Sequence, residues 1–165
     1  MFYHAASNQY ILENTAFTIG DTHYPSNWLS HSTQEQKNAL GLIEVTVEGQ
    51  REDDRFYWVT ENRNGAVISY TNAPKDLAGL KAQWKAQINH NAYTMLLPSD
   101  WMVVKAIETS TAVAADWTAY RAAVRSAAAA AAVAIDAATD VDALKVAIQI
   151  TWPNNPDYVE VSNGA

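Results

Sequence analysis

The chain contains no cysteine, which excludes a disulfide bond, a thiolate metal ligand and a cysteine nucleophile. Its four histidines, His4, His23, His31 and His90, lack the close spacing that is typical of metal ligands. A glycine-rich phosphate loop, a nucleophile elbow and a His-Glu-x-x-His pattern are also missing from the sequence. These absences favour a protein that is not an enzyme and that uses no metal or cofactor.

Positive charge is scarce, because 11 Lys and Arg residues face 18 Asp and Glu residues and the net charge is −7. Proteins that bind nucleic acid concentrate Lys and Arg on one surface, so nucleic acid is not an expected partner. The opening Met-Phe-Tyr-His lacks the charged head and apolar run of a signal peptide. The weakly polar run 126–138 is interrupted by Asp136 and is shorter than the roughly 20 residues that span a bilayer. We therefore expect action in a cytoplasm, without a membrane partner.

The first 40 residues carry the pattern of short strands followed by a short helix. Residues 9–12 and 16–19 predict brief strands, because β-branched and aromatic side chains occur between turn-forming residues. A helix is expected from 33 to 40, and Ser32 and Glu35 have the spacing of a capping box at its start.

A β-hairpin is the clearest local prediction. Residues 56–60 and 67–70 are rich in β-branched and aromatic side chains, and Asn64-Gly65 between them is a strong turn signal. A further strand is expected over 42–48, and Pro74 should end the β region.

Helices are expected in the rest of the chain. Over 75–97, large side chains recur at the three-and-four spacing of one helical face: Leu77, Leu80, Trp84, Ile88 and Met95. Ser99 or Asp100 is a candidate N-cap for the next helix, and Asp116 for a helix that runs into the alanine-rich stretch. Thr139 or Asp140 is the candidate cap of a last helix before Trp152-Pro153.

The predicted fold class is therefore α+β. The expected parts are a small β-rich module with a hairpin at 1–73, a connecting helix at 74–98, a C-terminal helical module at 99–156 and a tail at 157–165.

Aromatic side chains of the N-terminal part are candidate partner-binding residues: Tyr24, Trp28, Phe56, Tyr57 and Trp58. They could form an aromatic platform for a sugar or a protein. Alternate residues of a strand normally face a core, however, so at least half of them are expected to be buried.

Three segments in the second half resemble the C-terminal module of bacteriophage tail fibre assembly chaperones. They are Tyr93-Thr94-Met95-Leu96-Leu97-Pro98-Ser99-Asp100-Trp101, then Trp117-Thr118-Ala119-Tyr120-Arg121-Ala122-Ala123-Val124-Arg125, then Trp152-Pro153-Asn154-Asn155-Pro156. The similarity covers about 93–156, and the alanine-rich helix and the 140–149 helix enlarge the usual gap before Trp152. A looser similarity to phage tail proteins covers Phe17 to Leu29 and Ala39 to Leu42.

The resemblance implies a helper that binds a tail fibre or receptor-binding protein near its C-terminal tip and assists folding and trimerisation. Asp100 and Trp101 would cap and anchor the first helix of the module, while Trp117, Tyr120 and Trp152 would build its core and Pro153 would follow them. Arg121 and Arg125, four residues apart on one helical face, could pair with Asp or Glu of the same module.

Two alternatives to a chaperone remain open at this point. The protein could be a virion component retained at the fibre tip or tail as a cap or adhesin, or an enzyme acting on glycans through paired carboxylates such as Asp53 and Asp54. A solvated loop is the simpler interpretation of those charges. As a chaperone it would act in the host cytoplasm during phage assembly. Because fibres are trimeric, a homotrimer is favoured over a dimer.

Overall fold

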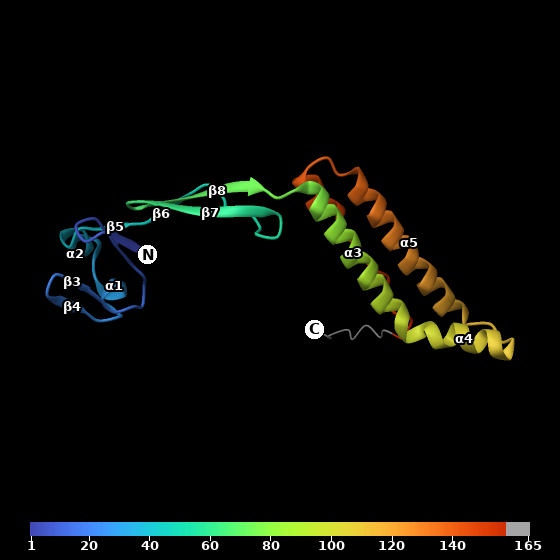
Figure 1. The fold of residues 1–165 in the computed structure, drawn as a ribbon. Helices are drawn as coiled ribbons and strands as arrows, with labels where there is room; N and C mark the ends of the chain where they lie inside the picture. Colours follow the sequence, from blue (N-terminus) through green and yellow to red (C-terminus); the bar gives the residue numbers. More distant parts are fainter. Residues whose placement is uncertain (158–165) are drawn as a thin grey trace. The chain divides into compact units, whose positions relative to one another are not determined.

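In this computed structural model, residues 1–157 are described, and they form two units, Met1–Ala73 and a second that begins at Pro74 (Figure 1). The first unit holds all the described strands and two short helices, whereas the second is helical. The predicted α+β class is thus confirmed. The tail expected at 157–165 lies, apart from Asp157, outside the described residues.

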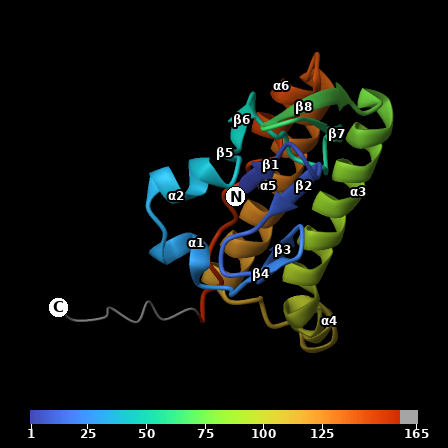
Figure 2. The same ribbon diagram turned by 90° about the vertical axis from the view of Figure 1, so that its left-hand side faces the viewer.

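Two small sheets build the N-terminal part of the first unit (Figure 2). The first has the antiparallel order β2–β1–β5, and the second pairs β3 with β4. Their bounds are β1 Phe2–His4, β2 Gln9–Ile11, β3 Phe17–Ile19, β4 Thr22–Tyr24 and β5 Leu42–Glu44. A common core holds them together: Phe2, Ile11, Phe17, Leu29 and Leu42, each at most 6% exposed.

Two short helices, α1 (Trp28–His31) and α2 (Gln34–Ala39), follow the second sheet. The capping box of α2 is formed by Thr33 and Gln36, so the predicted pair Ser32 and Glu35 is wrong by one residue. Both pairs match the capping-box pattern in sequence. The Ser32 hydroxyl instead donates to the carbonyl of Trp28 at 2.7 Å and closes α1.

The predicted hairpin is present and longer than expected. It consists of β7 (Tyr57–Asn64) and β8 (Val67–Pro74), and β6 (Thr46–Glu48) pairs in parallel with β8 to give the order β6–β8–β7. Gly65 takes φ +57° in the turn, a conformation that glycine adopts without strain. At the tip, the Tyr10 hydroxyl donates to the Gly65 carbonyl at 2.7 Å, which ties the hairpin to β2.

The second unit is built on a pair of long helices, α3 and α5, that run side by side in opposite directions (Figure 1). Its elements are α3 Leu77–Leu96, the 3-10 turn Leu97–Ser99, α4 Asp100–Thr109, α5 Ala115–Ala137 and α6 Val141–Ala147. At one end of the pair, Lys81 and Lys85 of α3 donate to Asp136 of α5 at 3.0 and 2.7 Å. The alanine-rich stretch lies within α5, as its helix propensity predicts.

The helix starts differ in how they are capped. Asp116 does not cap α5, because the helix begins at Ala115 and the Asp116 carboxylate accepts from the backbone of Trp117 within it. By contrast, Asp140 caps α6 and accepts from the Ala143 amide at 2.7 Å.

Replacing Asp140 with alanine is expected to lower the free energy of unfolding by about 1 kcal/mol, because an orphan amide at the start of α6 loses its acceptor. Urea unfolding followed by circular dichroism measures this loss. Thr139→Ala is the control, since Thr139 makes only a 3.5 Å contact to the Asp140 carboxylate. A larger loss for Thr139→Ala than for Asp140→Ala would contradict the assignment of the cap.

Candidate partner-binding surface

Arg121 joins two of the three motif segments. Its Nη1 donates to the Leu96 carbonyl at 3.0 Å and to the Ser99 hydroxyl at 2.5 Å, and its Nη2 donates to the Asp100 carboxylate at 2.7 Å. Arg121 is 7% exposed and Ser99 is fully buried. A guanidinium with several donors in a rigid fork can serve these acceptors at once, which an ammonium cannot do in the same geometry.

This network corrects the expected role of Ser99 and Asp100. Ser99 is the residue before α4, but its side chain makes no capping hydrogen bond and donates instead to the Leu96 carbonyl at 2.8 Å. The Ser99 hydroxyl and the Asp100 carboxylate both accept hydrogen bonds from Arg121, which explains why neither side chain caps the helix. The predicted pairing with an acidic residue is confirmed for Arg121. Arg125 instead contacts the Arg121 carbonyl at 3.5 Å, so the same expectation is wrong for Arg125. The network holds the corner between α3 and α4 against the start of α5.

The aromatic motif residues form the core next to this corner, as predicted. Trp117 and Tyr120 are 9% and 6% exposed, and their rings meet edge to face with centroids 5.7 Å apart. Trp152 is partly buried and packs on the same cluster. Pro153 follows it in a segment without regular structure, so the third motif closes the helical core.

Trp101 is not an anchor, and here the expectation from the sequence is wrong. Its side chain is 56% exposed, because the turn at Leu97–Ser99 directs this part of α4 away from the core. No residue of α4 is buried, although most of the helix is apolar. Val104 is 54% exposed and Ile107 is 78% exposed. A short helix with large apolar side chains in solvent is typical of a surface that binds another molecule.

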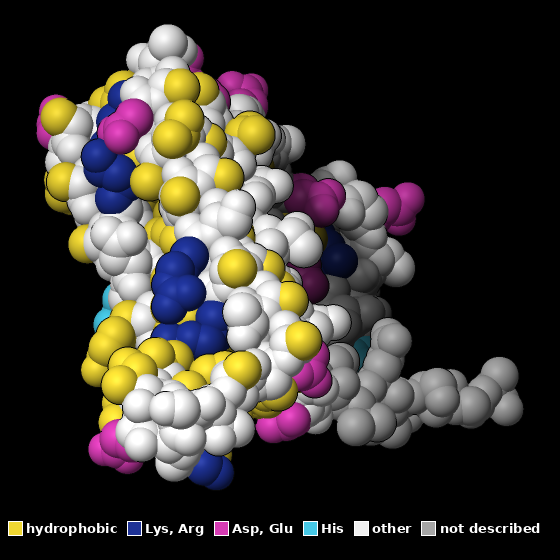
Figure 3. Space-filling model, turned by 90° about the vertical axis from the view of Figure 1, so that its right-hand side faces the viewer, with side chains coloured by type: hydrophobic (Ala, Val, Ile, Leu, Met, Phe, Trp, Pro, Cys, Tyr) yellow, Lys and Arg dark blue, Asp and Glu magenta, His cyan; other side chains and the backbone are white. Residues whose placement is uncertain are grey.

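We call this area the α4 surface, and it consists of Trp101, Val103, Val104, Lys105 and Ile107. Hydrophobic side chains gather with lysine and arginine on this side of the helical unit (Figure 3). The Lys105 ammonium lies 5.7 Å from the centroid of the Trp101 ring. Trp101 also lines a groove, together with the 111–114 segment and Trp117.

A second groove on the other side of α4 carries positive charge. It is lined by Val103, Val113, Thr118, Arg121 and Arg125. Arg125 is exposed, and its guanidinium makes a 3.5 Å contact to the Arg121 carbonyl. The α4 surface and the groove beside it therefore combine exposed apolar side chains with two exposed cations, Lys105 and Arg125. This composition suits a partner with apolar and acidic groups.

The aromatic candidates of the first unit do not form one platform. Tyr24 and Trp28 pack with Phe17 in the N-terminal core, with ring centroids 4.9 to 5.9 Å apart. Phe56 is 2% exposed and is unavailable to a partner, whereas Tyr57 is partly buried and Trp58 is 67% exposed. Of these five residues, Trp58 is the one whose side chain is mostly exposed.

The charged 51–55 loop consists of ion pairs. Arg51 pairs with Asp54, and Arg55 pairs with Asp53 at 2.6 Å. The hydrogen bond and the charge of these carboxylates raise the pKa of each arginine above its ordinary value. Paired carboxylates in a polar loop favour the solvated-loop interpretation over catalysis.

Within residues 1–157, no group of three or more His, Asp or Glu side chains is arranged to hold a metal ion. In the same part of the chain, no helix is both long and apolar enough to cross a bilayer.

Comparison of this protein with protein-family models, with curated protein sequences and with solved structures finds no significant match.

Proposed function

We propose that the protein is a tail fibre assembly chaperone that binds the fibre protein and assists its folding and trimerisation in the host cytoplasm. The α4 surface is the observation that carries this proposal, because a helix that leaves large apolar side chains in solvent is suited to binding a partner. The family is supported by the resemblance of the three motif segments in sequence.

The arrangement of these motifs agrees with a docking role. Residues of the first and second motifs stabilise the corner between α3 and α4. Arg121 donates hydrogen bonds to Ser99 and Asp100, and Trp117 and Tyr120 lie in the helical core. The side chains that α4 presents outward are then held by a rigid support. A preorganised surface binds more tightly, because less conformational entropy is lost on association.

Fibre chains need such a partner for a physical reason. They bring three copies of a largely β polypeptide into register, and unpaired edges and apolar surface exposed during that process pair wrongly or aggregate. A helper that covers such a surface on each chain prevents wrong pairing until the three chains meet.

Val104→Glu is expected to abolish the action on the fibre while leaving the helper folded, because it places a charge in the middle of the apolar surface. The fibre protein from the same genome is coexpressed with wild-type or variant helper, and its soluble trimer is quantified by native gel and light scattering. Val146→Glu on α6 is the matched control, since Val146 is 69% exposed and lies outside the α4 surface.

Two outcomes would contradict the proposal. A fibre that forms soluble trimers equally well without the helper removes the chaperone role. A helper found in stoichiometric amount in purified particles, with no effect on fibre solubility, supports instead a virion component at the fibre tip or tail.

A further inference from the structure

Two grooves of different chemistry adjoin the α4 surface. The first, which we call the tryptophan groove, is lined by Trp101, Trp117 and several smaller apolar residues, and Lys105 is its one charged residue. The second, which we call the arginine groove, is lined by Val103, Val113, Thr118, Arg121 and Arg125. Val113 lines the tryptophan groove as well, so the two grooves adjoin each other.

Every charged residue that lines these grooves is a cation, although acidic residues outnumber basic ones by 18 to 11 in the chain. The acids of the same helices are held elsewhere. Asp100 belongs to the corner network, and Glu108 and Asp116 line neither groove. In the described part of the chain, neither Lys105 nor Arg125 has a carboxylate partner. This charge distribution is complementary to an acidic ligand.

The size of the grooves indicates what kind of ligand they accept. Each has a volume of about 200 Å³. Sites for small molecules commonly have roughly 300–1,000 Å³, so each groove suits a single side chain better than a whole small molecule. Adjoining apolar and cationic grooves therefore fit a peptide segment in which an apolar and an acidic side chain lie close together.

We propose that the two grooves bind one segment of the fibre protein, with an apolar side chain in the tryptophan groove and an Asp or Glu side chain in the arginine groove. The inference rests on the proposed function for the identity of the partner. It adds the chemistry of the bound segment and the residue that recognises its acid.

Arg125, rather than Arg121, is the residue that pairs with this acid. Arg121 is 7% exposed, and its guanidinium already donates to three acceptors in the corner. Arg125 is exposed one turn further along α5, and it makes only a 3.5 Å contact to a backbone carbonyl. A guanidinium can donate to both oxygens of one carboxylate, which gives a strong and directional contact.

Overlapping short peptides that cover the fibre protein from the same genome are the probe. Their binding to the whole chain is measured by fluorescence polarisation at low salt. The peptides that bind are expected to share an Asp or Glu close to a large apolar side chain. Replacing this acid with its amide should weaken binding about tenfold, because a charge-assisted hydrogen bond is lost.

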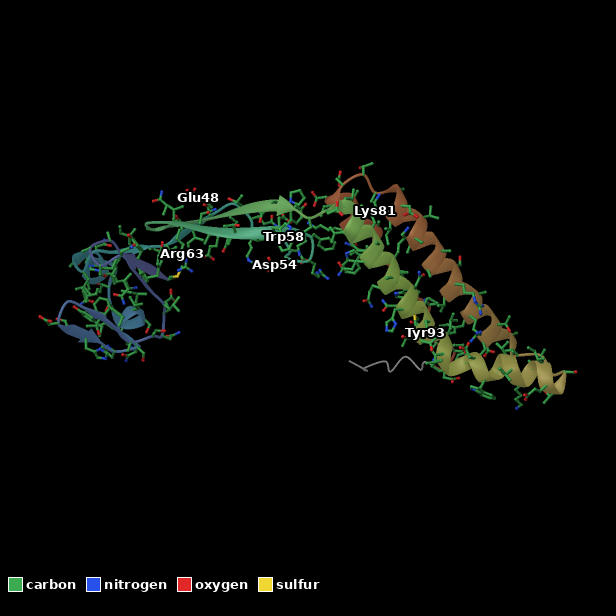
Figure 4. All side chains as sticks on the ribbon, in the orientation of Figure 1. Glu48, Asp54, Trp58, Arg63, Lys81 and Tyr93 are labelled. Atoms are coloured by element: carbon green, nitrogen blue, oxygen red, sulfur yellow. The ribbon has the colours of Figure 1, made fainter. Side chains whose placement is uncertain are left out.

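Arg125→Gln should weaken the same peptides about tenfold, and Arg125→Lys should restore part of the affinity. Lys81→Gln is the matched control, because it also removes one positive charge from the helical unit. Lys81 lies near the start of α3, whereas Tyr93 lies near its end, next to the corner (Figure 4). Glutamine at this position can still donate to the Asp136 carbonyl. Circular dichroism shows whether each variant is folded.

A double-mutant cycle tests the pairing itself. If Arg125 contacts the peptide acid, the acid-to-amide change should weaken binding to Arg125→Gln by less than about threefold, because the partner is already lost. Full and independent effects of the two changes would show that Arg125 does not bind this acid.

Four results would overturn the inference. They are the absence of binding to any peptide, bound peptides without an acid, equal effects of Arg125→Gln and Lys81→Gln, and binding to vesicles of anionic lipid in place of peptides. Vesicles are included because exposed tryptophan and cations also bind such surfaces.

The outcome for the chaperone role is separate. If the helper still raises the yield of fibre trimer on coexpression, that role stands and this inference alone fails. If the peptides bind as expected but the yield of trimer does not rise, the chaperone role fails and the recognition of an acidic segment stands.

Discussion

Arg121→Met is expected to lower the free energy of unfolding by about 3 kcal/mol, because methionine keeps the apolar stem and removes every hydrogen-bond donor. The Ser99 hydroxyl, which is fully buried, and the Leu96 carbonyl then lose their charged donor. The Asp100 side chain is 49% exposed, so water solvates its carboxylate and the loss stays below that of a wholly buried ion pair. Urea unfolding followed by far-UV circular dichroism measures the change.

Arg125→Met is the matched control for this prediction. Arg125 lies one turn further along α5, is exposed and makes only a 3.5 Å contact to a backbone carbonyl. Its replacement should change the free energy of unfolding by less than about 0.5 kcal/mol. Arg121→Lys should fall between the two, because one ammonium retains the charge but cannot reach all three acceptors. Equal losses for Arg121→Met and Arg125→Met would show that the corner network adds no stability.

Trp117→Ala is expected to lower the free energy of unfolding by about 3–5 kcal/mol, since it removes the largest side chain of the helical core and leaves a cavity. Trp117 contacts Tyr120 edge to face, and that contact is lost as well. Thermal unfolding followed by circular dichroism should show a matching fall in Tm.

Trp101→Ala provides the comparison, because it makes the same chemical change at a tryptophan that is 56% exposed. We expect a loss of less than about 1 kcal/mol in stability together with a loss of fibre binding. A large destabilisation by Trp101→Ala, or a small one by Trp117→Ala, would reverse the roles assigned to the two indoles.

Local features were the part of the fold that could be predicted. The hairpin around Gly65 and the helix now seen as α3 follow from turn residues and from side-chain periodicity, which act over a few neighbouring residues. The capping box was misplaced by one residue, because Ser32 and Thr33 both satisfy the same pattern. The two candidates differ in the structure because the Ser32 hydroxyl is already bonded to the Trp28 carbonyl.

The candidate site was predicted less well. Motif spacing identified the important residues, but it assigned Ser99 and Asp100 to a helix cap and Trp101 to an anchor. In the structure, Ser99 and Asp100 accept hydrogen bonds from Arg121, which lies more than 20 residues further along the chain. One feature of the sequence could have indicated that α4 is exposed. Residues 101–107 carry apolar side chains on more than one helical face, and a single neighbouring helix cannot bury all of these side chains.

The α+β class, the hairpin and the helices could be predicted from the sequence, because turn chemistry, propensity and periodicity are properties of adjacent residues. The sequence also marked Trp117, Tyr120 and Trp152 for the core, since large aromatic side chains are driven out of water wherever helices meet. The tertiary structure alone decided which tryptophan is exposed and which side chains Arg121 holds. Both depend on how α4 leaves α3 and how α5 returns along it, and these are contacts between residues far apart in the chain.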